Sequence, residues 1–404
     1  MERLKKEENG VPDRFVRWSG LLAGLAIAVA ACGGGGGASA SPQPSLPTAV
    51  GDGEGALSVL AWPGYAENGG YDPAVNWVKP FEDATGCKTD VKTFATSDEA
   101  FQLMSTQPEA YDVISASGDA SRRLVRSGLV QAINLDLIKT YPDIIPALKD
   151  KPWNTVDGVH YGIPHGRGPN LLVWRTDKVD PAPTSWSSIF DPAGNPTVTI
   201  YDAPIYIADA AVVLMKTKPD LKITDPYALD ETQFQAAVDL LKQQRPLVKD
   251  YWTDYLKQMD ALRGGNATIG TTWQYQVGLL QEEKPPVAVE AIKPAEGATG
   301  WSDTWMINSK TKHLNCSYKW LEYITSPEVN IQVAEWFGEA PANGKSCALS
   351  TIEGHCDLYH AEDEAYWNDI YYWNTPEETC LDGRTDVKCV PFDKWITAWT
   401  EIKG

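Results

Sequence analysis

The sequence predicts an α/β protein with two lobes. Its 404 residues are more than one hydrophobic core of ordinary size accommodates. Short apolar runs alternate with segments of helical periodicity in two successive series, a pattern typical of sheets flanked by helices. With 43% hydrophobic and 22% charged residues, the chain has the composition of a globular protein and not of a disordered chain or a coiled coil.

The first 55 residues are expected to direct export and to tether the protein. A head of mixed charge precedes the apolar run 21–31, which is shorter than the roughly 20 residues that span a bilayer. Val29-Ala30-Ala31-Cys32 resembles a bacterial lipobox, and the alternative is a plain signal peptide cut nearby. We therefore expect a lipoprotein signal peptide at 1–31, lipidated Cys32 and a flexible Gly/Ser/Pro tether over 32–55. This anchor would hold the protein on the outer face of the cytoplasmic membrane.

The elements of the first series begin with the apolar run 57–62, which predicts a buried strand. Thr96 and Glu99 have the spacing of a capping box, and they predict a helix that places Ala100, Phe101 and Met104 on one face. A second series follows Pro164, in which Asp230 and Gln233 are expected to cap a helix. The other expected elements are strands at 111–114, 171–174, 197–201, 268–273, 287–289 and 305–307, and helices at 318–324, 328–337 and 392–399.

The order of these elements predicts the division of the chain. The strand at 305–307 returns the chain toward the first lobe after the second series. We expect lobe 1 to comprise 56–165 and 304–345, and lobe 2 to comprise 166–303. Residues 346–404 are expected to form a disulfide-stapled, helical C-terminal segment that packs on the lobes.

Six cysteines remain besides Cys32, an even number that suits an oxidising compartment. Fifteen pairings are possible. The spacings favour Cys347 with Cys356 and Cys380 with Cys389, each closing a short polar loop, which leaves Cys87 for Cys316. A zinc site is the competing interpretation, but there is no Cys-x-x-Cys pair and the five histidines are scattered. We predict structural disulfides, no metal site and no cofactor.

Net charge excludes one class of function. The formal charge is −19, and no cluster of Lys or Arg offers the basic face that a nucleic-acid-binding protein needs. Tryptophan, with 16 residues, outnumbers phenylalanine, with 8, which indicates a use for flat, amphipathic rings.

Aromatic and polar side chains stand where predicted strands end, which is where α/β sheets place ligands. Singly, each has a structural explanation, because a strand-end Trp is usually core, Asp202 suits a turn and Asp119 suits a helix cap. Together, rings and carboxylates predict a site that attracts an organic cation. The candidate ligand-binding residues are Trp62, Tyr65, Ser117, Asp119, Asp202, Trp273, Trp301 and Asp303.

Five motifs from residue 57 onward resemble the spermidine/putrescine-binding proteins of bacterial ABC importers. They are Trp62-x-x-Tyr65, Tyr111-Asp112-Val113-Ile114-x-x-Ser117, Gly270-Thr271-Thr272-Trp273, Trp301-x-Asp303 and Phe337-Gly338-Glu339-Ala340-Pro341-Ala342-Asn343. The resemblance implies a two-lobed periplasmic-binding-protein fold of type II, with hinge crossovers near 164–168 and 301–303. It also implies a monomer that delivers a polyamine to a cognate permease and ATPase.

The resemblance implies roles for the candidate residues. The rings of Trp62, Tyr65, Trp273 and Trp301 would sandwich the methylene chain of the ligand. Asp303 and Asp202 would bind its ammonium groups, and Ser117 would form a hydrogen bond. This chain departs from the family pattern at Asp119, where an aromatic residue is common, at Ile205 and Tyr206, where a second acid is usual, and at 165–168, where aromatics are usual.

Two alternative ligands remain at this stage. Arg167 could clamp the acidic group of a zwitterion such as an amino-phosphonate or an opine, or it could pair with an acid inside the hinge. A sugar is the other alternative, since Trp also stacks on sugar rings.

An enzyme is not predicted, because the chain has no Gly-x-Ser-x-Gly, His-Glu-x-x-His or phosphate-loop motif. The acidic run 362–364 is expected to be a solvated surface.

Overall fold

The computed structural model describes residues 46–404. The predicted signal peptide, Cys32 and the first part of the expected tether lie outside the described residues. Within 46–404, none of the helices has the length and apolar character needed to cross a membrane.

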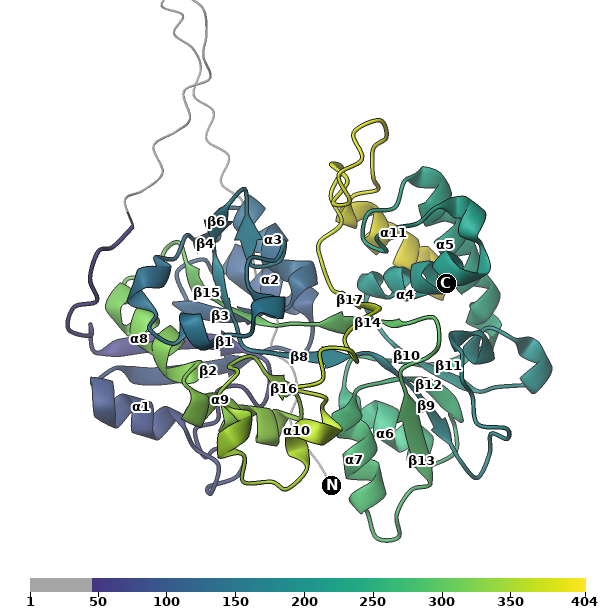
Figure 1. Cartoon of the computed structure of the whole chain (residues 1–404), viewed down its shortest axis with the longest axis horizontal. Coiled ribbons are helices and arrows are strands. Elements are labelled where there is room, and N and C mark those ends of the chain that lie inside the picture. Colours follow the sequence, from purple (N-terminus) through teal and green to yellow (C-terminus); the bar gives the residue numbers. More distant parts are fainter. Residues whose placement is uncertain (1–45) are drawn as a thin grey trace, which may run out of the picture. The chain divides into compact units, whose positions relative to one another are not determined.

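The first lobe is built on a sheet with the order β2-β1-β3-β15-β4, to which β7 adds by pairing with β15 (Figure 1). β1 runs parallel to β2 and β3, whereas β15 is antiparallel to β3, β4 and β7. The strands are β1 (Ala56–Ala61), β2 (Lys88–Thr93), β3 (Val113–Ala116), β4 (Val130–Gln131), β7 (Gly162–Pro164) and β15 (Thr304–Asn308), with a small hairpin of β5 (Thr155–Val156) and β6 (Val159–His160) nearby. Helices of this lobe are α1 (Val78–Thr85), α2 (Ser97–Thr106), α3 (Gly118–Arg126), α8 (Leu314–Ile324) and α9 (Pro327–Phe337).

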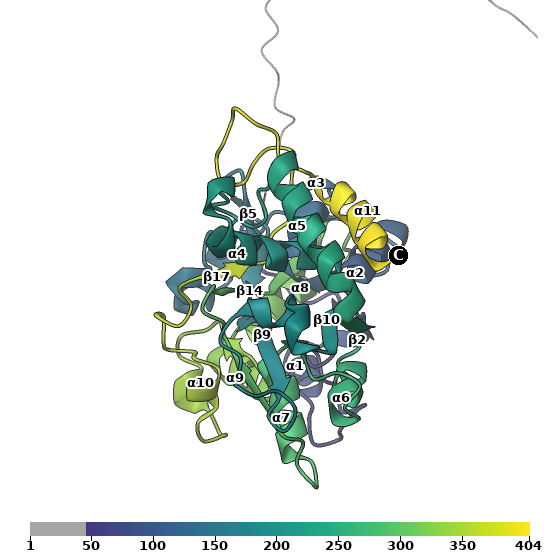
Figure 2. The same cartoon turned by 90° about the vertical axis from the view of Figure 1, so that its right-hand side faces the viewer.

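The second lobe is built on a sheet with the order β11-β10-β12-β9-β13, in which β10 is parallel to β11 and β12, and β9 is antiparallel to β12 and β13. Figure 2 shows α4 and α5 on one side of β9 and β10, with α6 and α7 toward the other. The strands are β9 (Leu171–Arg175), β10 (Val198–Tyr201), β11 (Val248–Trp252), β12 (Ile269–Thr272) and β13 (Val289–Ile292). The helices are α4 (Ile207–Thr217), α5 (Glu231–Gln244), α6 (Tyr255–Arg263), α7 (Gln274–Glu282) and α11 (Phe392–Lys403), the last of which packs on α5.

A third sheet joins the two lobes. The crossovers β8 (Gly166–Pro169) and β14 (Ala298–Trp301) pair antiparallel, and β16 (Ala340–Pro341) and β17 (Ile370–Tyr372) extend them to the order β16-β8-β14-β17. A Cβ on Gly168 would lie 2.3 Å from the Trp301 ring, so only glycine lets this ring lie flat on β8. The short helix α10 (His355–Leu358) lies in the C-terminal segment, before β17. The predicted two-lobed α/β fold with hinge crossovers is confirmed.

Local signals behaved mostly as expected. The capping box at α5 is complete, because the side-chain oxygens of Asp230 and Gln233 each accept a hydrogen bond from the backbone N–H of the other residue. At α2, Thr96 accepts from the backbone N–H of Glu99, but the Glu99 carboxylate accepts from Ala95 instead of Thr96. The strand expected at 287–289 begins only at Val289, since it follows two prolines that cannot donate to a ladder.

Each lobe has its own hydrophobic core. Trp305 and Trp320 are fully buried in the first core, with ring centres 5.6 Å apart and an edge-to-face arrangement. In the second, Trp252 and Trp395 are fully buried. Since α11 supplies Trp395, the C-terminal helix completes the core of the second lobe.

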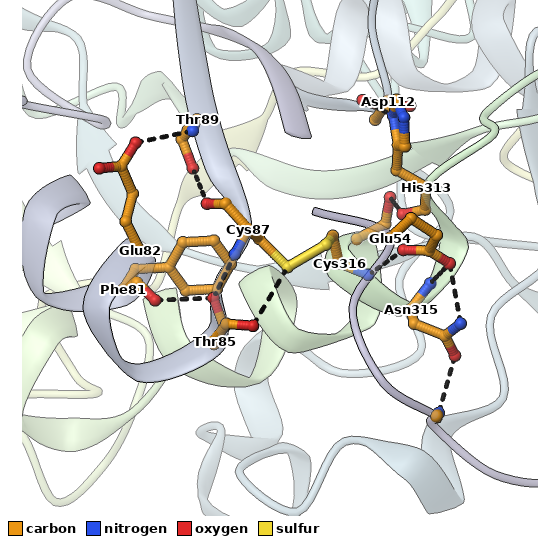
Figure 3. Close-up of a disulfide and its surroundings, with 12 residues drawn as sticks. Glu54, Phe81, Glu82, Thr85, Cys87, Thr89, Asp112, His313, Asn315 and Cys316 are labelled. Carbon is orange, nitrogen blue, oxygen red and sulfur yellow. Dashed lines mark hydrogen bonds and ion pairs between the residues drawn. A yellow bond between two sulfur atoms is a disulfide. The ribbon is translucent and has the colours of Figure 1, made fainter. Parts of the chain in front are cut away.

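The structure forms all three favoured disulfides, Cys87–Cys316, Cys347–Cys356 and Cys380–Cys389. Figure 3 shows the first of them beside Glu54, whose carboxylate accepts from the backbone N–H groups of Asn315 and Cys316. These are N–H groups of the first turn of α8, which an α-helix leaves free and an acidic side chain stabilises.

The end of the expected tether is therefore held to the first lobe. Besides the Glu54 contact, the backbone N–H of Gly51 donates to Asn315, and a Cβ on Gly53 would lie 2.6 Å from the Cys87 sulfur. The expectation of a flexible tether as far as residue 55 is wrong for this part. Residues 51–54 are held in place because the Glu54 carboxylate binds the first turn of α8 and Gly53 packs on the disulfide.

Candidate functional site

Five of the eight candidate residues line one cavity between the lobes. Its volume is about 40 Å³, and its lining comprises Trp62, Ser117, Trp273, Trp301, Asp303, Phe337 and Trp373. The sequence predicted the first five of these. Their side chains give the cavity four tryptophan rings, one further ring, a hydroxyl and a single carboxylate.

Strand ends bring these residues together, as predicted. Trp62 follows β1, and Ser117 is the N-cap residue of α3 directly after β3. Trp273 stands between β12 and α7, Trp301 is the last residue of β14, and Asp303 lies in the two-residue turn before β15. Because parallel strands end at a common edge of their sheet, residues far apart in the sequence meet here.

Asp303 is the electrostatic centre of the cavity. Its carboxylate accepts hydrogen bonds from the Ser117 hydroxyl at 2.5 Å and from the Tyr65 hydroxyl at 2.8 Å. The Trp62 indole N–H in turn donates to Ser117 Oγ at 3.2 Å. Burial raises the pKa of Asp303 to about 6, against the opposing effect of both hydrogen bonds. No Lys or Arg among residues 46–404 pairs with this carboxylate, so it is a free acceptor for a cation.

Behind Asp303 lies a second acid that the sequence did not place in the site. The Tyr65 hydroxyl is also 2.9 Å from Glu339 Oε2, and both residues are fully buried. A phenol has only one hydrogen to donate, so the second contact requires a proton on Glu339. Burial and the nearby Asp303 charge raise the pKa of Glu339 well above its usual range. Glu339 therefore donates to Tyr65, which donates to Asp303, and the site keeps one negative charge.

His165, named among the departures from the family pattern, lies beside this pair. Its Nε2 is 3.6 Å from Glu339 Oε1, beyond hydrogen-bond distance, and the ring packs against Tyr65 with centres 4.4 Å apart. Full burial lowers the pKa of His165 to about 3, so the imidazole is neutral. The histidine packs in the hinge and adds no charge to the site.

Two predicted carboxylates do not reach the cavity. Asp119 accepts from the Ser97 hydroxyl at 2.8 Å inside the first lobe, where burial raises its pKa to about 7. Asp202 accepts from Lys403 Nζ at 2.7 Å and from the Trp399 indole N–H at 2.8 Å. Asp202 therefore does not line the cavity, because Trp399 and Lys403 of α11 bind its carboxylate and hold it away.

Trp373 was missed by the sequence analysis. It directly follows β17, and its ring stacks on that of Tyr201 with centres 5.9 Å apart and planes at 11°. Its backbone passes so close to α3 that a Cβ on Gly118 would lie 1.8 Å from the Trp373 carbonyl oxygen. The only signal in the sequence was the aromatic run of residues 371–373, in a segment expected merely to pack on the lobes.

Asp209, on α4, was missed as well. It lines a second, smaller cavity of about 10 Å³ that shares Trp273 and Trp373 with the first. Its carboxylate accepts from the Thr299 hydroxyl at 2.8 Å, and burial raises its pKa to about 7. Thr299 accepts in turn from Asn170, which accepts from the Trp273 indole N–H. A chain of hydrogen bonds thus fixes the ring between the two cavities.

Arg167 is a hinge residue. It is fully buried, its guanidinium bonds the Glu364 carboxylate at 2.6 Å, and it lies 4.1 Å from the ring centre of Trp367. The alternative in which Arg167 clamps an acidic ligand therefore finds no support, since its donors point to the C-terminal segment. The acidic run at 362–364 is exposed, as expected, and Glu364 forms its ion pair with Arg167 from the surface.

The site offers hydrogen-bond acceptors, one negative charge and several ring faces. No group of three or more His, Cys, Asp or Glu side chains within 46–404 is arranged to hold a metal ion. Such a site can bind a cation with hydrogen-bond donors and an apolar body.

Comparison with known proteins agrees with this geometry. The sequence profile of the bacterial extracellular solute-binding proteins matches residues 76–353. The chain is 24% identical over 268 residues to the spermidine/putrescine-binding periplasmic protein of Escherichia coli K12, covering 66% of this chain and 73% of that protein. It is 23% identical over 319 residues to spermidine/putrescine-binding periplasmic protein 1 of Haemophilus influenzae, covering 77% and 83%.

Solved structures share the fold. The spermidine/putrescine ABC transporter substrate-binding protein of Streptococcus pneumoniae matches with a TM-score of 0.66 at 17% identity, over 86% of this chain and 99% of that one. MotA of Agrobacterium tumefaciens B6, solved with glucopine, matches with a TM-score of 0.67 at 16% identity and the same coverage. Since the profile match spans more than half of the sequence, the chain belongs to the bacterial extracellular solute-binding proteins, which serve transport and are not enzymes.

Proposed function

We propose that this protein captures a polyamine or a related organic cation for an ABC importer. The observation that carries the proposal is Asp303, a buried carboxylate without a cationic partner among the described residues, set among the rings of Trp62, Trp273, Trp301 and Trp373. An ammonium group gains a charge-assisted bond to the carboxylate and favourable contacts with ring faces. Relatives that bind spermidine and putrescine support the same ligand class.

A second carboxylate defines the expected length of the ligand. Asp303 and Asp209 lie in two cavities that share Trp273 and Trp373. In the proposed complex, one ammonium group binds each acid, and the methylene chain lies against the shared rings. Asp209 thus takes the role that the sequence analysis gave to Asp202, and Ser117 and Tyr65 hold Asp303 in place.

Ligand entry requires the lobes to separate. A cavity of about 40 Å³ holds only a few groups of the size of water. We infer that 56–165 with 304–345 and 166–303 move as the two bodies, about the paired crossovers β8 and β14. Ligand favours the closed state because it contacts both bodies. The monomeric closed form is what the permease, which works with the ATPase, would recognise.

A thermal-shift panel on the mature protein tests the ligand class. We expect putrescine, cadaverine or spermidine to raise the melting temperature, since ligand at 100 times its dissociation constant stabilises by about 2.7 kcal/mol. Choline, an amino-phosphonate, an opine and a sugar should shift it less. A larger shift with an opine or a sugar, and none with any amine, would contradict the proposal.

The membrane anchor is a separate part of the proposal. The family is extracellular, so the protein is exported, and Cys32 supplies the acylation site of the proposed lipoprotein. A Cys32→Ser variant should move from the membrane fraction to the soluble extracytoplasmic fraction, because a serine cannot carry the thioether-linked lipid. Fractionation with immunoblotting measures this, with Ser39→Ala as the matched control. Equal membrane retention of both variants would rule out the anchor.

A further inference from the structure

Apart from the two cavities at Asp303 and Asp209, a surface hollow lies where the two lobes meet. Its volume is about 100 Å³, and its walls include Glu67, Tyr71, Tyr255, Tyr275, Trp336 and Phe337. Tyr255 begins α6 and Tyr275 lies in α7, both of the second lobe, whereas the other four belong to the first. In Figure 1, α7 and the end of α9 lie near one another, and a Cβ on Gly338 would lie 2.8 Å from the Tyr275 Cβ.

The rings of the lining form two pairs, one from each lobe. Tyr71 and Trp336 have ring centres 6.2 Å apart in an edge-to-face arrangement. Tyr255 and Tyr275 have ring centres 5.9 Å apart. Faces and hydroxyl oxygens of aromatic rings carry partial negative charge, so such an arrangement favours a cation over a neutral or anionic guest.

The one charged side chain in the lining of the hollow is negative. It is Glu67, and no Lys, Arg or His contributes to the lining. No ion pair with Glu67 is formed by the residues that the structure describes. Burial is the main cause that raises the pKa of Tyr275 to about 12, with smaller contributions from Tyr255, Tyr71 and Glu282.

One ring separates this hollow from the inner cavity. Phe337 lines both, and it packs on Trp301 with ring centres 5.7 Å apart and planes at 85°. Gly64 permits this close packing, because it has φ +98° and a Cβ there would lie 3.0 Å from the Phe337 ring. A cation in the hollow would therefore lie one aromatic layer from the site at Asp303.

We propose that this hollow is a second, outer binding site for an organic ammonium group. It takes the cation between Glu67 and the rings of Tyr71, Tyr255, Tyr275 and Trp336, and Phe337 divides it from the inner site. Because both lobes contribute walls, occupancy also favours the closed arrangement. The inference rests on the proposed function for the class of cation, but its residues are distinct from those of the inner site.

Calorimetry with putrescine as the probe tests this site. The wild-type protein should bind two equivalents, one tightly and one weakly. Asp303→Asn should remove the tight phase and keep the weak one, whereas Glu67→Gln and Tyr71→Ala should each weaken only the weak phase, by about fivefold or more. Tyr71 is 81% exposed, so its removal leaves packing intact. Butane-1,4-diol, which has the same chain without charge, should give neither phase.

The controls separate the two proposals. Glu362→Gln removes an exposed acid elsewhere and should leave both phases unchanged. A single tight equivalent in the wild-type protein, or a weak phase that Glu67→Gln and Tyr71→Ala leave unaltered, would overturn the outer site while the proposed function stands. A weak phase without any tight phase in the wild-type protein would overturn the proposed function instead.

Discussion

An Asp303→Asn variant should bind putrescine at least 30-fold more weakly than the wild-type protein. The variant keeps the shape of the side chain and loses its charge, so an ammonium group exchanges a charge-assisted bond for a neutral one. Such bonds to charged groups contribute about 1.5 to 3 kcal/mol, and central, desolvated contacts lose about 2 kcal/mol or more on replacement. Titration calorimetry of both proteins at pH 7.5 measures the difference.

Asp202→Asn is the matched control, because it removes the acid that the sequence analysis placed in the site. Since Lys403 and Trp399 bind this carboxylate, the variant should keep the affinity of the wild-type protein within about twofold, although it removes an ion pair. A large loss in Asp202→Asn together with none in Asp303→Asn would reverse the assignment of the two acids.

Acidification should reproduce the effect of the Asp303 substitution. The pKa of Asp303 is raised to about 6, so its charge, and the attraction for a cation, disappears as pH falls through that value. The ammonium groups of the ligand stay protonated, hence affinity should fall between pH 7 and pH 5. The change in affinity centred near pH 6 should be absent in Asp303→Asn. A wild-type affinity that does not vary between pH 7 and pH 5 would contradict this prediction.

The unliganded fold should respond in the opposite direction. A carboxyl whose folded pKa lies above its unfolded value of about 3.9 binds more protons in the folded state, so folding stability falls as pH rises through that interval. Asp303→Asn removes this cost, and its melting temperature at neutral pH should equal or exceed that of the wild-type protein. Retained folding with lost affinity distinguishes a binding role from a structural one.

The candidate residues that the structure brings together at the cavity are those whose positions are determined locally. Trp62, Ser117 and Trp273 each end or follow a strand that could be recognised from a short apolar run, whereas Trp301 was placed only beside the expected crossover. Once the strands are known, the edge of the sheet at which they end is known too. Short-range patterns were therefore enough to predict that residues as far apart in the sequence as Trp62 and Trp301 lie close together, because the sheet supplies the long-range order.

The errors share a physical cause, which is contact with the C-terminal segment. Asp202 follows a strand as convincingly as Ser117 does, but Lys403, 201 residues later, neutralises it. Trp373 enters the cavity from the same segment. No periodicity in the sequence records which surface a terminal segment covers. Asp209 was missed for another reason. It lies in the mostly apolar helix α4, not at the end of a strand, and only the structure shows that it lines the smaller cavity.

The largest effect on stability is expected from the disulfide that joins the most distant cysteines. Cys87 and Cys316 are 229 residues apart, whereas the partners of each of the other two disulfides are 9 apart. In the chain-entropy description, closing the long loop stabilises the fold by roughly 5.5 kcal/mol, against roughly 2.6 kcal/mol for a short one. Replacing Cys87 and Cys316 together by alanine should therefore lower the free energy of unfolding by roughly 3 kcal/mol more than the same change at Cys347 and Cys356.

Alanine is the proper replacement because Cys87 and Cys316 are fully buried, and a serine there would add an unsatisfied hydroxyl to the loss of the crosslink. The contact of Gly53 with both sulfurs adds to the same difference, since the variant leaves a gap beneath residues 51–55. Denaturant unfolding of the two double variants and the wild-type protein measures all three free energies. Equal losses in the two variants would show that loop length does not determine the contribution, and that the short disulfide stabilises the native C-terminal segment as strongly as the long one stabilises the first lobe.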